Sequence, residues 1–326
     1  MNTKRKKRGK IMILTCTVLF LVSFIFGVAS KFLWKSEWSK KYDVEFTSDV
    51  GTKYKDIAYG NKESNTFDIY VPKDHTKEKY GLVVYLHAGG FTTGDKSEDH
   101  NMLSWLCSKG YVAAGINYTL RNEKNPEANV YTQSMEIQQA IPMVIKEAEK
   151  YGYTIDKMAI GGGSAGHALA MIYAYRDAKI SPVPVKLLFG AVGPSSFYAQ
   201  DWDIYGFDKN TKESNEGAAA LFSVMSGETI TADMIEDGSY IEKIKPISAV
   251  MHVDENSVAS VVAYGQYDKV QPFKGAQRLL KAFQQHAIDY RFFICPHSGH
   301  GLQNDNAIYK EYMESVEAYL QQYLPV

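Results

Sequence analysis

The sequence contains little cysteine, with three residues in 326. Cys16 lies inside an apolar run near the N-terminus, whereas Cys107 and Cys295 sit in apolar surroundings far apart along the chain. Small secreted domains that depend on disulfides carry many more cysteines at closer spacing. This scarcity argues against a disulfide framework, so the stability of the fold has to come from a buried core.

The chain also lacks a strong excess of one charge. It has 36 Lys and Arg against 37 Asp and Glu, and it shows no basic stripe with interleaved aromatic residues of the kind that binds nucleic acid. It contains no internal repeat and no low-complexity tract. A hydrophobic content of 45% with 22% charged residues is ordinary for a globular protein with a sizeable core. These features give nucleic-acid binding and repeat architectures no support.

The N-terminus differs from the rest of the chain. Residues 1–10 contain six basic and no acidic side chains, and residues 11–30 form an uncharged, apolar run. A cleaved signal usually has about 7 to 15 apolar residues, whereas a membrane span needs about 17 or more. We therefore expect an uncleaved anchor at 11–30, with residues 1–10 in the cytoplasm and the remainder outside the cell membrane. Small residues at the end of the run leave a cleaved signal and a secreted protein as the alternative.

The remaining chain predicts an α/β fold. Residues 31–53 are polar with scattered aromatics and indicate a stalk or linker, or an initial hairpin, and the folded domain is expected to cover 54–326. Residues 135–150 show helical spacing of apolar side chains despite Pro142. Strand-like apolar runs alternate with helix-length stretches, which is typical of a mostly parallel sheet covered on both faces. The expected strands are 67–71, 82–86, 111–116, 158–160, 187–192, 258–264 and 290–294.

Residues 194–250 interrupt this alternation between two expected strands. Long insertions in compact domains are usually functional or disordered. We expect a small lid near the carboxyl ends of the strands, where ligands bind in open α/β sheets. Tyr198 and Trp202, within this lid, are candidate substrate-pocket residues.

A G-x-S-x-G pattern stands at 162–166, where an expected strand ends and a helix-forming run begins. A serine on a sharp strand-to-helix turn presents its hydroxyl above the sheet, and the flanking glycines allow the tight turn. Ser164 is therefore the candidate nucleophile. The five-residue pattern alone is weakly specific, so the interpretation depends on a base, an acid and an oxyanion hole elsewhere.

A serine hydroxyl needs a base to become a good nucleophile, and the base needs a carboxylate that orients it. His300 follows the last expected strand in a loop of small residues, and Asp268 follows the strand 258–264. The chain order Ser164, Asp268, His300 is that of α/β-hydrolases. His297 is the alternative base, while His167 is expected to line the pocket or to pack, with direct chemistry a lesser alternative. Asp254 and Asp289, the alternative acids, are expected at the opposite edge of the sheet.

Donors for an oxyanion are expected from two places. His87-Ala88-Gly89-Gly90-Phe91 follows an apolar strand, and its glycines allow backbone N–H groups to approach a ligand. The second source is the amide of the residue after the nucleophile. The predicted oxyanion hole is therefore Gly89, Gly90 and Ala165.

With these motifs, the chain resembles the α/β-hydrolase superfamily, in particular the esterase and lipase branch with a His-Gly-Gly-Gly oxyanion loop. That branch includes the hormone-sensitive-lipase-like and the feruloyl- or acetyl-esterase-like members. The resemblance covers residues 54–326 and rests on His87 to Phe91 with Gly94-Asp95-Lys96, Gly110-Tyr111 with Asn117-Tyr118, Gly162 to Gly166, Gly265 to Asp268, and His300-Gly301. It implies a serine carboxylesterase fold without metal or organic cofactor. Two departures are Ala88, in place of a loop glycine, and His167, where many relatives carry glycine.

The leading functional hypothesis is hydrolysis of short-chain or carbohydrate-linked acyl esters through an acyl-enzyme. An amidase or exopeptidase of the same fold is the nearest alternative, because the same residues cleave amides when the leaving nitrogen is protonated in place. A non-catalytic binding or adhesion domain is a further alternative, since fold does not fix function. The sequence leaves the oligomeric state undefined.

Overall fold

The structure, a computed structural model, describes residues 37–326. The predicted cytoplasmic segment 1–10, the predicted anchor 11–30 and the first residues of the predicted stalk lie outside the described residues. The chain divides into two compact units, one ending at Tyr42 and the other covering Asp43–Val326. In the described part of the first unit, Glu37–Tyr42 forms the short helix η1. Within residues 37–326, no helix combines the length and the apolar character needed to cross a membrane.

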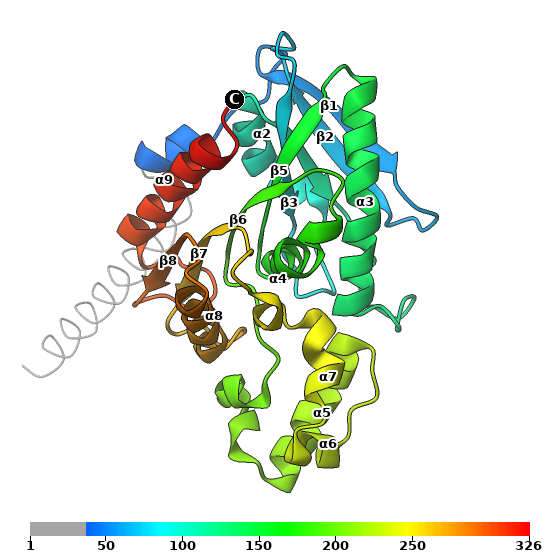
Figure 1. Cartoon of the computed structure of the whole chain (residues 1–326), viewed down its shortest axis with the longest axis vertical. Helices are drawn as coiled ribbons and strands as arrows, with labels where there is room; N and C mark the ends of the chain where they lie inside the picture. Colours follow the sequence, from blue (N-terminus) through cyan, green and yellow to red (C-terminus); the bar gives the residue numbers. More distant parts are fainter. Residues whose placement is uncertain (1–36) are drawn as a thin grey trace, which may run out of the picture. The chain divides into compact units, whose positions relative to one another are not determined.

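An eight-stranded sheet forms the centre of the second unit (Figure 1). Its strands lie in the order β1-β2-β4-β3-β5-β6-β7-β8, and the six from β4 to β8 in this order run parallel. β1 and β2 are antiparallel to their neighbours at one edge. The strands are β1 (Gly51–Ala58), β2 (Thr66–Pro72), β3 (Tyr80–Leu86), β4 (Val112–Ile116), β5 (Ile155–Gly163), β6 (Val185–Ala191), β7 (Ala259–Gly265) and β8 (Tyr290–Cys295). The mostly parallel sheet expected from the sequence is confirmed, and each of the seven expected strands is present.

The sequence did not indicate β1. After a buried Gly51, this edge strand has only exposed and half-buried positions, including Lys53 and Lys55, and its pairing with β2 is irregular between Tyr54 and Ile57. Charged residues and a bulge are means by which sheets protect an exposed edge strand, and the polar composition of β1 is that of a linker. The compact unit Asp43–Val326 includes the whole of this strand.

Helices cover both faces of the sheet, as expected (Figure 1). Helices α2 and α9 pack on one face, where Lys109 pairs with Glu317 across them at 2.8 Å. α3, α4 and α8 pack on the other face. The longer helices are α2 (His100–Ser108), α3 (Val130–Lys150), α4 (Ala165–Ile172), α8 (Phe273–Gln285) and α9 (Asn306–Tyr323). The short helical turn η2 (Lys96–Asp99) precedes α2, and the turns η3 (Tyr173–Asp177) and η4 (Ala178–Ile180) follow α4.

Helix α3 begins before the expected position 135. Asn129 accepts a hydrogen bond from the backbone N–H of Thr132 at 2.9 Å, and the Thr132 hydroxyl is 3.0 Å from the Asn129 N–H. These two bonds satisfy N–H groups that a helix start leaves without partners. The capping pair fixes the helix start at Val130, five residues before the apolar periodicity becomes clear.

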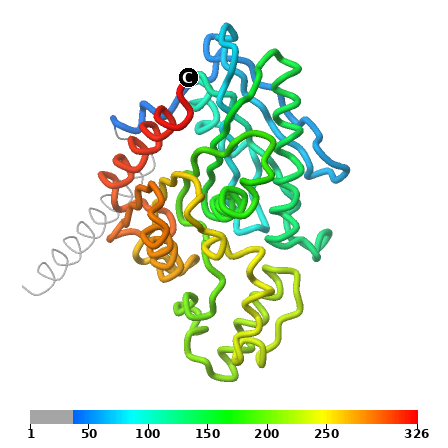
Figure 2. The backbone as a smooth tube through the Cα atoms, viewed as in Figure 1, coloured from blue at the N-terminus to red at the C-terminus, as the bar shows by residue number. Residues whose placement is uncertain are grey.

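Residues 192–258, which we call the insertion, connect β6 to β7 and form a group of helices and helical turns apart from the sheet (Figures 1 and 2). The insertion has its own aromatic centre, in which Phe197, Trp202, Phe222 and Tyr240 pack ring against ring. Its helices are η5 (Ala199–Asp201), η6 (Asp203–Tyr205), η7 (Phe207–Lys209), α5 (Lys212–Ser226), α6 (Ala232–Asp237), α7 (Ile241–Ile244), η8 (Lys245–Ile247) and η9 (Ala249–His252).

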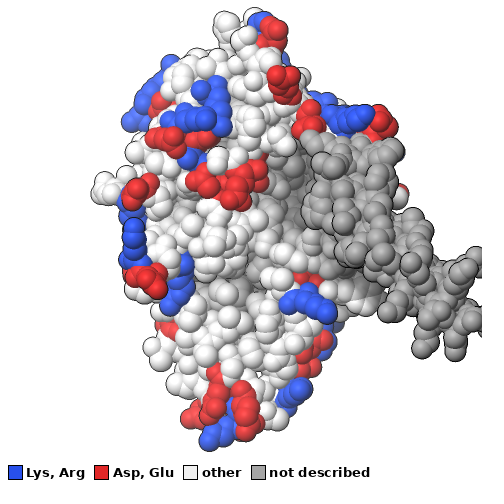
Figure 3. Space-filling view, turned by 180° about the vertical axis from the view of Figure 1, so that it is seen from behind, with Lys and Arg blue, Asp and Glu red and all other residues white. Residues whose placement is uncertain are grey.

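The visible surface carries no large area of one charge. On the uncovered part of the face in Figure 3, Lys and Arg lie close to Asp and Glu around the margin, and the middle is mostly uncharged. This interspersed pattern matches the near balance of charges in the sequence.

Candidate active site

Ser164 stands at the turn between β5 and α4. Its backbone has φ 49° and ψ −116°, a sparsely populated conformation for a residue with a side chain. Such a conformation costs about 1 to 3 kcal/mol and persists only where the surroundings impose it. Here the Ser164 N–H donates to the Ala191 carbonyl at 2.9 Å, and the Ser164 carbonyl accepts from the Ala168 N–H at 3.0 Å. The backbone strain therefore lies at Ser164, the candidate nucleophile, at the carboxyl end of β5.

The glycines around Ser164 are required by space. A Cβ at Gly166 would lie 1.9 Å from the Leu86 carbonyl oxygen, and one at Gly162 would lie 2.5 Å from the Gly166 carbonyl carbon. By contrast, a Cβ at Gly163 would have its nearest neighbour, the Tyr85 hydroxyl, at 3.9 Å. The positions of the pattern that demand glycine are thus those where β3 and the start of α4 come into contact.

Ser164, His300 and Asp268 form one hydrogen-bonded chain. Ser164 Oγ lies 2.8 Å from His300 Nε2, and His300 Nδ1 lies 2.7 Å from Asp268 Oδ2. The other oxygen, Asp268 Oδ1, accepts the backbone N–H groups of Val270 and Gln271 at 2.8 and 3.0 Å. The Asp268 side chain is 2% exposed and that of His300 is 29% exposed. A buried, fixed carboxylate behind a partly open imidazole can orient that imidazole to take a proton from the serine.

The sheet explains why three residues distant in sequence meet. Ser164 follows β5, Asp268 follows β7 and His300 follows β8, and these strands run parallel within one sheet. The carboxyl ends of parallel strands lie at the same edge, where the following loops meet. The structure thus brings together the three residues to which the sequence order and strand positions pointed.

The alternative residues lie elsewhere. His297 is largely exposed and its Nδ1 bonds to Asp305 at 2.9 Å. Asp254 precedes β7 and pairs with Lys179, and Asp289 precedes β8 and accepts hydrogen bonds from Tyr319 and Tyr323. Both carboxylates are at the amino edge of the sheet, as expected from their order. They are structural partners of other elements.

The loop after β3 contains three consecutive residues with positive φ: Gly89 at 121°, Gly90 at 59° and Phe91 at 68°. A Cβ at Gly89 would lie 2.0 Å from the Thr93 carbonyl oxygen, whereas one at Gly90 would meet nothing within 4 Å. Ala88 is not among the residues with positive φ, so its replacement of a family glycine adds no backbone strain.

Two further motifs brace this loop. The His87 ring stacks on the Tyr118 ring with centroids 4.3 Å apart, and the Tyr118 hydroxyl donates to the His87 carbonyl at 2.9 Å. The Asn117 side chain donates to Asp95 at 2.7 Å and accepts the Lys96 N–H at 2.7 Å. Burial lowers the pKa of His87, which favours its neutral form. These residues hold the end of β3 against the end of β4.

Sequence reasoning missed Asp305, which braces the loop that carries His300. Its carboxylate accepts the Ser298 hydroxyl at 2.6 Å and the His297 N–H at 3.0 Å. Burial acts to raise the pKa of Asp305, but hydrogen bonds from Ser298 and His297 outweigh it and lower that pKa below the usual value. A lone Asp before a helix is usually a cap or turn residue, so no sequence signal pointed to this role.

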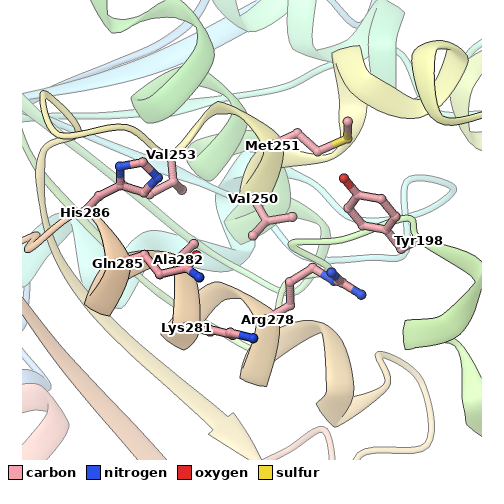
Figure 4. A pocket seen from close by; sticks show the side chains of 9 residues that line it. All are labelled: Tyr198, Val250, Met251, Val253, Arg278, Lys281, Ala282, Gln285 and His286. Atoms are coloured by element: carbon pink, nitrogen blue, oxygen red, sulfur yellow. The ribbon is translucent and has the colours of Figure 1, made fainter.

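The three candidate pocket residues are not grouped around Ser164. His167 is fully buried beneath the nucleophile turn, and Trp202 is buried in the insertion with its indole N–H donating to the Ser196 carbonyl at 2.9 Å. Of the two expectations for His167, lining the pocket or packing, its burial agrees with packing, and Trp202 packs within the insertion instead of facing a pocket. Tyr198 does line a cavity, of about 370 Å³, between α8 and η9. Its neighbours there include Arg278, Met251 and His286, and none of Ser164, Asp268 or His300 (Figure 4).

Comparison with known proteins identifies the family and the fold of the chain. The BD-FAE family model matches residues 67–283, more than half of the chain. A probable carboxylic ester hydrolase, LipM, of Mycobacterium tuberculosis is 25% identical over 236 residues, covering 71% of this chain and 51% of LipM. Kynurenine formamidase of Salmo salar is 27% identical over 128 residues, covering 39% of this chain and 41% of that protein. The chain thus spans about half the length, or less, of these curated relatives.

Among solved structures, a truncated carbohydrate esterase from gut microbiota superposes with a TM-score of 0.65 at 18% identity. The match covers 85% of this chain and 98% of that one. At this identity the similarity concerns the fold, which is the α/β-hydrolase fold. Taken with the family match over residues 67–283, it shows that the chain belongs to the BD-FAE family of α/β-hydrolases.

Proposed function

We propose that this protein is a serine hydrolase that cleaves carboxylic esters through an acyl-enzyme intermediate. The observation that carries the proposal is the hydrogen-bonded chain from Ser164 through His300 to buried Asp268, with links of 2.8 and 2.7 Å. Family membership and the names of relatives such as a probable carboxylic ester hydrolase support the same reaction.

In the proposed reaction, Ser164 Oγ attacks the ester carbonyl while His300 Nε2 takes its proton. Asp268 holds the imidazole in the required tautomer and stabilises the imidazolium. His300 then protonates the leaving alcohol, and the acyl group stays on Ser164. Water, deprotonated by His300, attacks this acyl-enzyme and releases the acid, which regenerates the serine.

The developing oxyanion would be held by the backbone N–H groups of Gly89, Gly90 and Ala165. Ala165 is the first residue of α4, and the first N–H groups of a helix have no partner within that helix. The same helix end favours negative charge. The glycine loop after β3 resembles the His-Gly-Gly-Gly loop, with Ala88 accommodated without positive φ.

For the substrate, we propose short-chain or carbohydrate-linked acyl esters, with the insertion acting as a lid over the site. The carbohydrate esterase among the structural neighbours supports the carbohydrate class. Hydrolysis of nitrophenyl acetate, butyrate and longer esters should be compared with that of an acetylated oligosaccharide. A preference for acyl chains of ten or more carbons would contradict the substrate proposal while leaving the reaction intact.

Ser164→Ala tests the reaction. We expect kcat on nitrophenyl acetate to fall by at least about 10³-fold. Ser257→Ala is a matched control at the amino edge of the sheet, where the hydroxyl accepts the Asp254 N–H, and it should keep wild-type kcat. Equal activity of wild type and Ser164→Ala would refute the assignment, and a folded but inactive wild type would favour a non-catalytic domain.

Amide hydrolysis is the second candidate, favoured by one observation, the similarity to kynurenine formamidase. The measurement is the ratio of kcat/KM for an ester and for the formanilide or aminoacyl anilide with the same acyl group. If the ratio of ester to anilide kcat/KM is far above the ratio of the uncatalysed hydrolysis rates, the esterase is supported. Preferential cleavage of the anilide supports the amidase or exopeptidase.

We further propose that residues 11–30 anchor the protein in the cell membrane with the catalytic unit outside. The basic residues before this uncharged run support the orientation. Mass spectrometry of the membrane-bound protein should recover the N-terminal residues. A mature chain starting near Lys31 would instead show a cleaved signal and a secreted enzyme.

A further inference from the structure

His167 is a buried imidazole directly beneath the candidate nucleophile. It lies one helical turn after Ser164 on α4 and is 0% exposed. Its Nδ1 atom accepts a hydrogen bond from the backbone N–H of Gly193 at 3.1 Å. A nitrogen that accepts a hydrogen bond carries no proton, so a neutral ring must carry its proton on Nε2.

The end of β6 is built around this ring. A Cβ at Gly190 would lie 2.4 Å from His167 Cδ2, and one at Gly193 would lie 2.8 Å from His167 Cβ. Any larger residue at either position would displace the imidazole or the strand end. The two glycines therefore let residues 190–193 lie directly against α4.

The segment 190–193 in turn supports Ser164. Its Ala191 carbonyl accepts the Ser164 N–H at 2.9 Å, and Val192 has a positive φ of 52°. A positive φ is strained for a β-branched residue and has to be imposed by neighbouring contacts. The Val192 N–H donates to the Ala263 carbonyl at 2.9 Å, and the Tyr264 hydroxyl donates to the Gly193 carbonyl at 3.1 Å.

We propose that His167 is a positioning residue for Ser164: through Gly193 it fixes the strained segment 190–193, whose Ala191 carbonyl holds the nucleophile's backbone. The inference rests on the proposed function and extends it to a residue outside the reacting groups. Because the segment 190–193 includes the first residues of the insertion, His167 also fixes the point at which the insertion leaves the sheet.

Burial is consistent with this arrangement. It lowers the pKa of His167 to about 3, an effect that the Ala191 carbonyl partly offsets. The ring is then neutral throughout the physiological range, and Nδ1 stays available as an acceptor. Tyr264, whose ring centroid is 5.8 Å away, is also neutral because burial raises its pKa well above the usual value.

The test compares two substitutions of similar size. His167→Leu removes the acceptor and should lower kcat for nitrophenyl acetate by about 10- to 100-fold, because small displacements of a reacting group have effects of this size. KM should change less than about threefold, since ester binding is not altered. His167→Asn keeps an acceptor near the Nδ1 position and should stay within about threefold of wild-type kcat. His75→Asn, at an exposed histidine after β2, is the matched control.

Two outcomes would overturn the proposal: wild-type kcat in His167→Leu, or equal losses in His167→Leu and His167→Asn, which would show a packing role. Nitrogen-15 NMR of histidine-labelled full-length protein gives a second readout that needs neither variant folding nor activity. We expect an unprotonated Nδ1 and a protonated Nε2 down to pH 5. A ring that titrates near pH 6.5 would contradict the geometry, whereas failure of ester hydrolysis alone would contradict only the proposed function.

Discussion

At the scale of residues, Asp268 uses its two carboxylate oxygens for different contacts. Oδ1 accepts two backbone N–H groups of its own loop, and Oδ2 bonds to His300. An asparagine keeps an oxygen for the loop but presents an NH₂ group to the imidazole. That group would favour the tautomer in which His300 Nε2 is a donor and unable to accept the serine proton.

We therefore expect Asp268→Asn to fold normally and to lose about 10³- to 10⁴-fold in kcat. Steady-state hydrolysis of nitrophenyl acetate measures the loss, and urea unfolding checks the fold. Asp254→Asn, at the other edge of the sheet, is the control with intact activity. A loss below tenfold in Asp268→Asn would show that another group orients His300.

The sequence predicted these residues to different extents. Ser164, Asp268 and His300 were expected to meet because chain order and strand ends constrain them, and the structure brings them together. Asp305 was missed because its contacts with Ser298 and His297 depend on the folded conformation of the loop between β8 and α9, which the sequence does not reveal. His167 was expected to line the pocket or to pack, and it packs. The end of β6 leaves space for its ring because residues 190 and 193 are glycines.

At the scale of elements, the loop from His87 to Phe91 combines two different demands on glycine. Gly89 has both a positive φ and no room for a Cβ, whereas Gly90 has a φ of 59° and open space. An L-residue in this left-handed region costs about 1 to 2 kcal/mol, but it fits sterically. A substitution at Gly89 therefore changes both the backbone strain and the position of the loop, whereas one at Gly90 changes the backbone strain alone.

Gly89→Ala should displace the loop and lower kcat by about 10²-fold or more, the effect of losing one oxyanion donor. Gly90→Ala should remain within about tenfold of wild type, because its Cβ meets no atom. The two variants are compared in the rate of acyl-enzyme formation by stopped flow. Rates of acyl-enzyme formation equal to that of wild type in both variants would remove this loop from the proposed oxyanion hole.

Elements with a clear apolar pattern were predicted more reliably than those at edges. The buried parallel strands carry nearly continuous apolar runs, and β7 is buried at every position. β1 is polar and irregular because it borders solvent, and the start of α3 depends on the cap formed by Asn129. Such boundaries depend on single contacts, so periodicity alone does not give them.

At the scale of the whole molecule, a buried neutral histidine links stability to pH. The pKa of His167 is about 3 in the folded chain, against an ordinary value near 6.5. Between these values the unfolded state binds more protons, so stability falls as the pH decreases from about 6.5 toward 3. The slope from one group approaches about 1.4 kcal/mol per pH unit.

His167→Asn should remove this contribution. Urea unfolding of both proteins at several pH values between 7 and 4 measures the difference, in which all other titrating groups cancel. We expect the free energy of unfolding of wild type to fall more steeply by about 1 kcal/mol per pH unit below pH 6. Parallel pH profiles would show that His167 is not buried in its neutral form.

The most direct test of the whole account is covalent labelling of the full-length chain with a fluorophosphonate. The sheet brings Ser164, Asp268 and His300 together from separate loops, and only a serine activated in this way reacts rapidly with such a probe. We predict about one probe per chain on Ser164, loss of ester hydrolysis in proportion to labelling, and no labelling of Ser164→Ala. A folded wild type that takes up no probe, or a Ser164→Ala variant labelled as fast as wild type, would contradict the assignment of Ser164 as nucleophile.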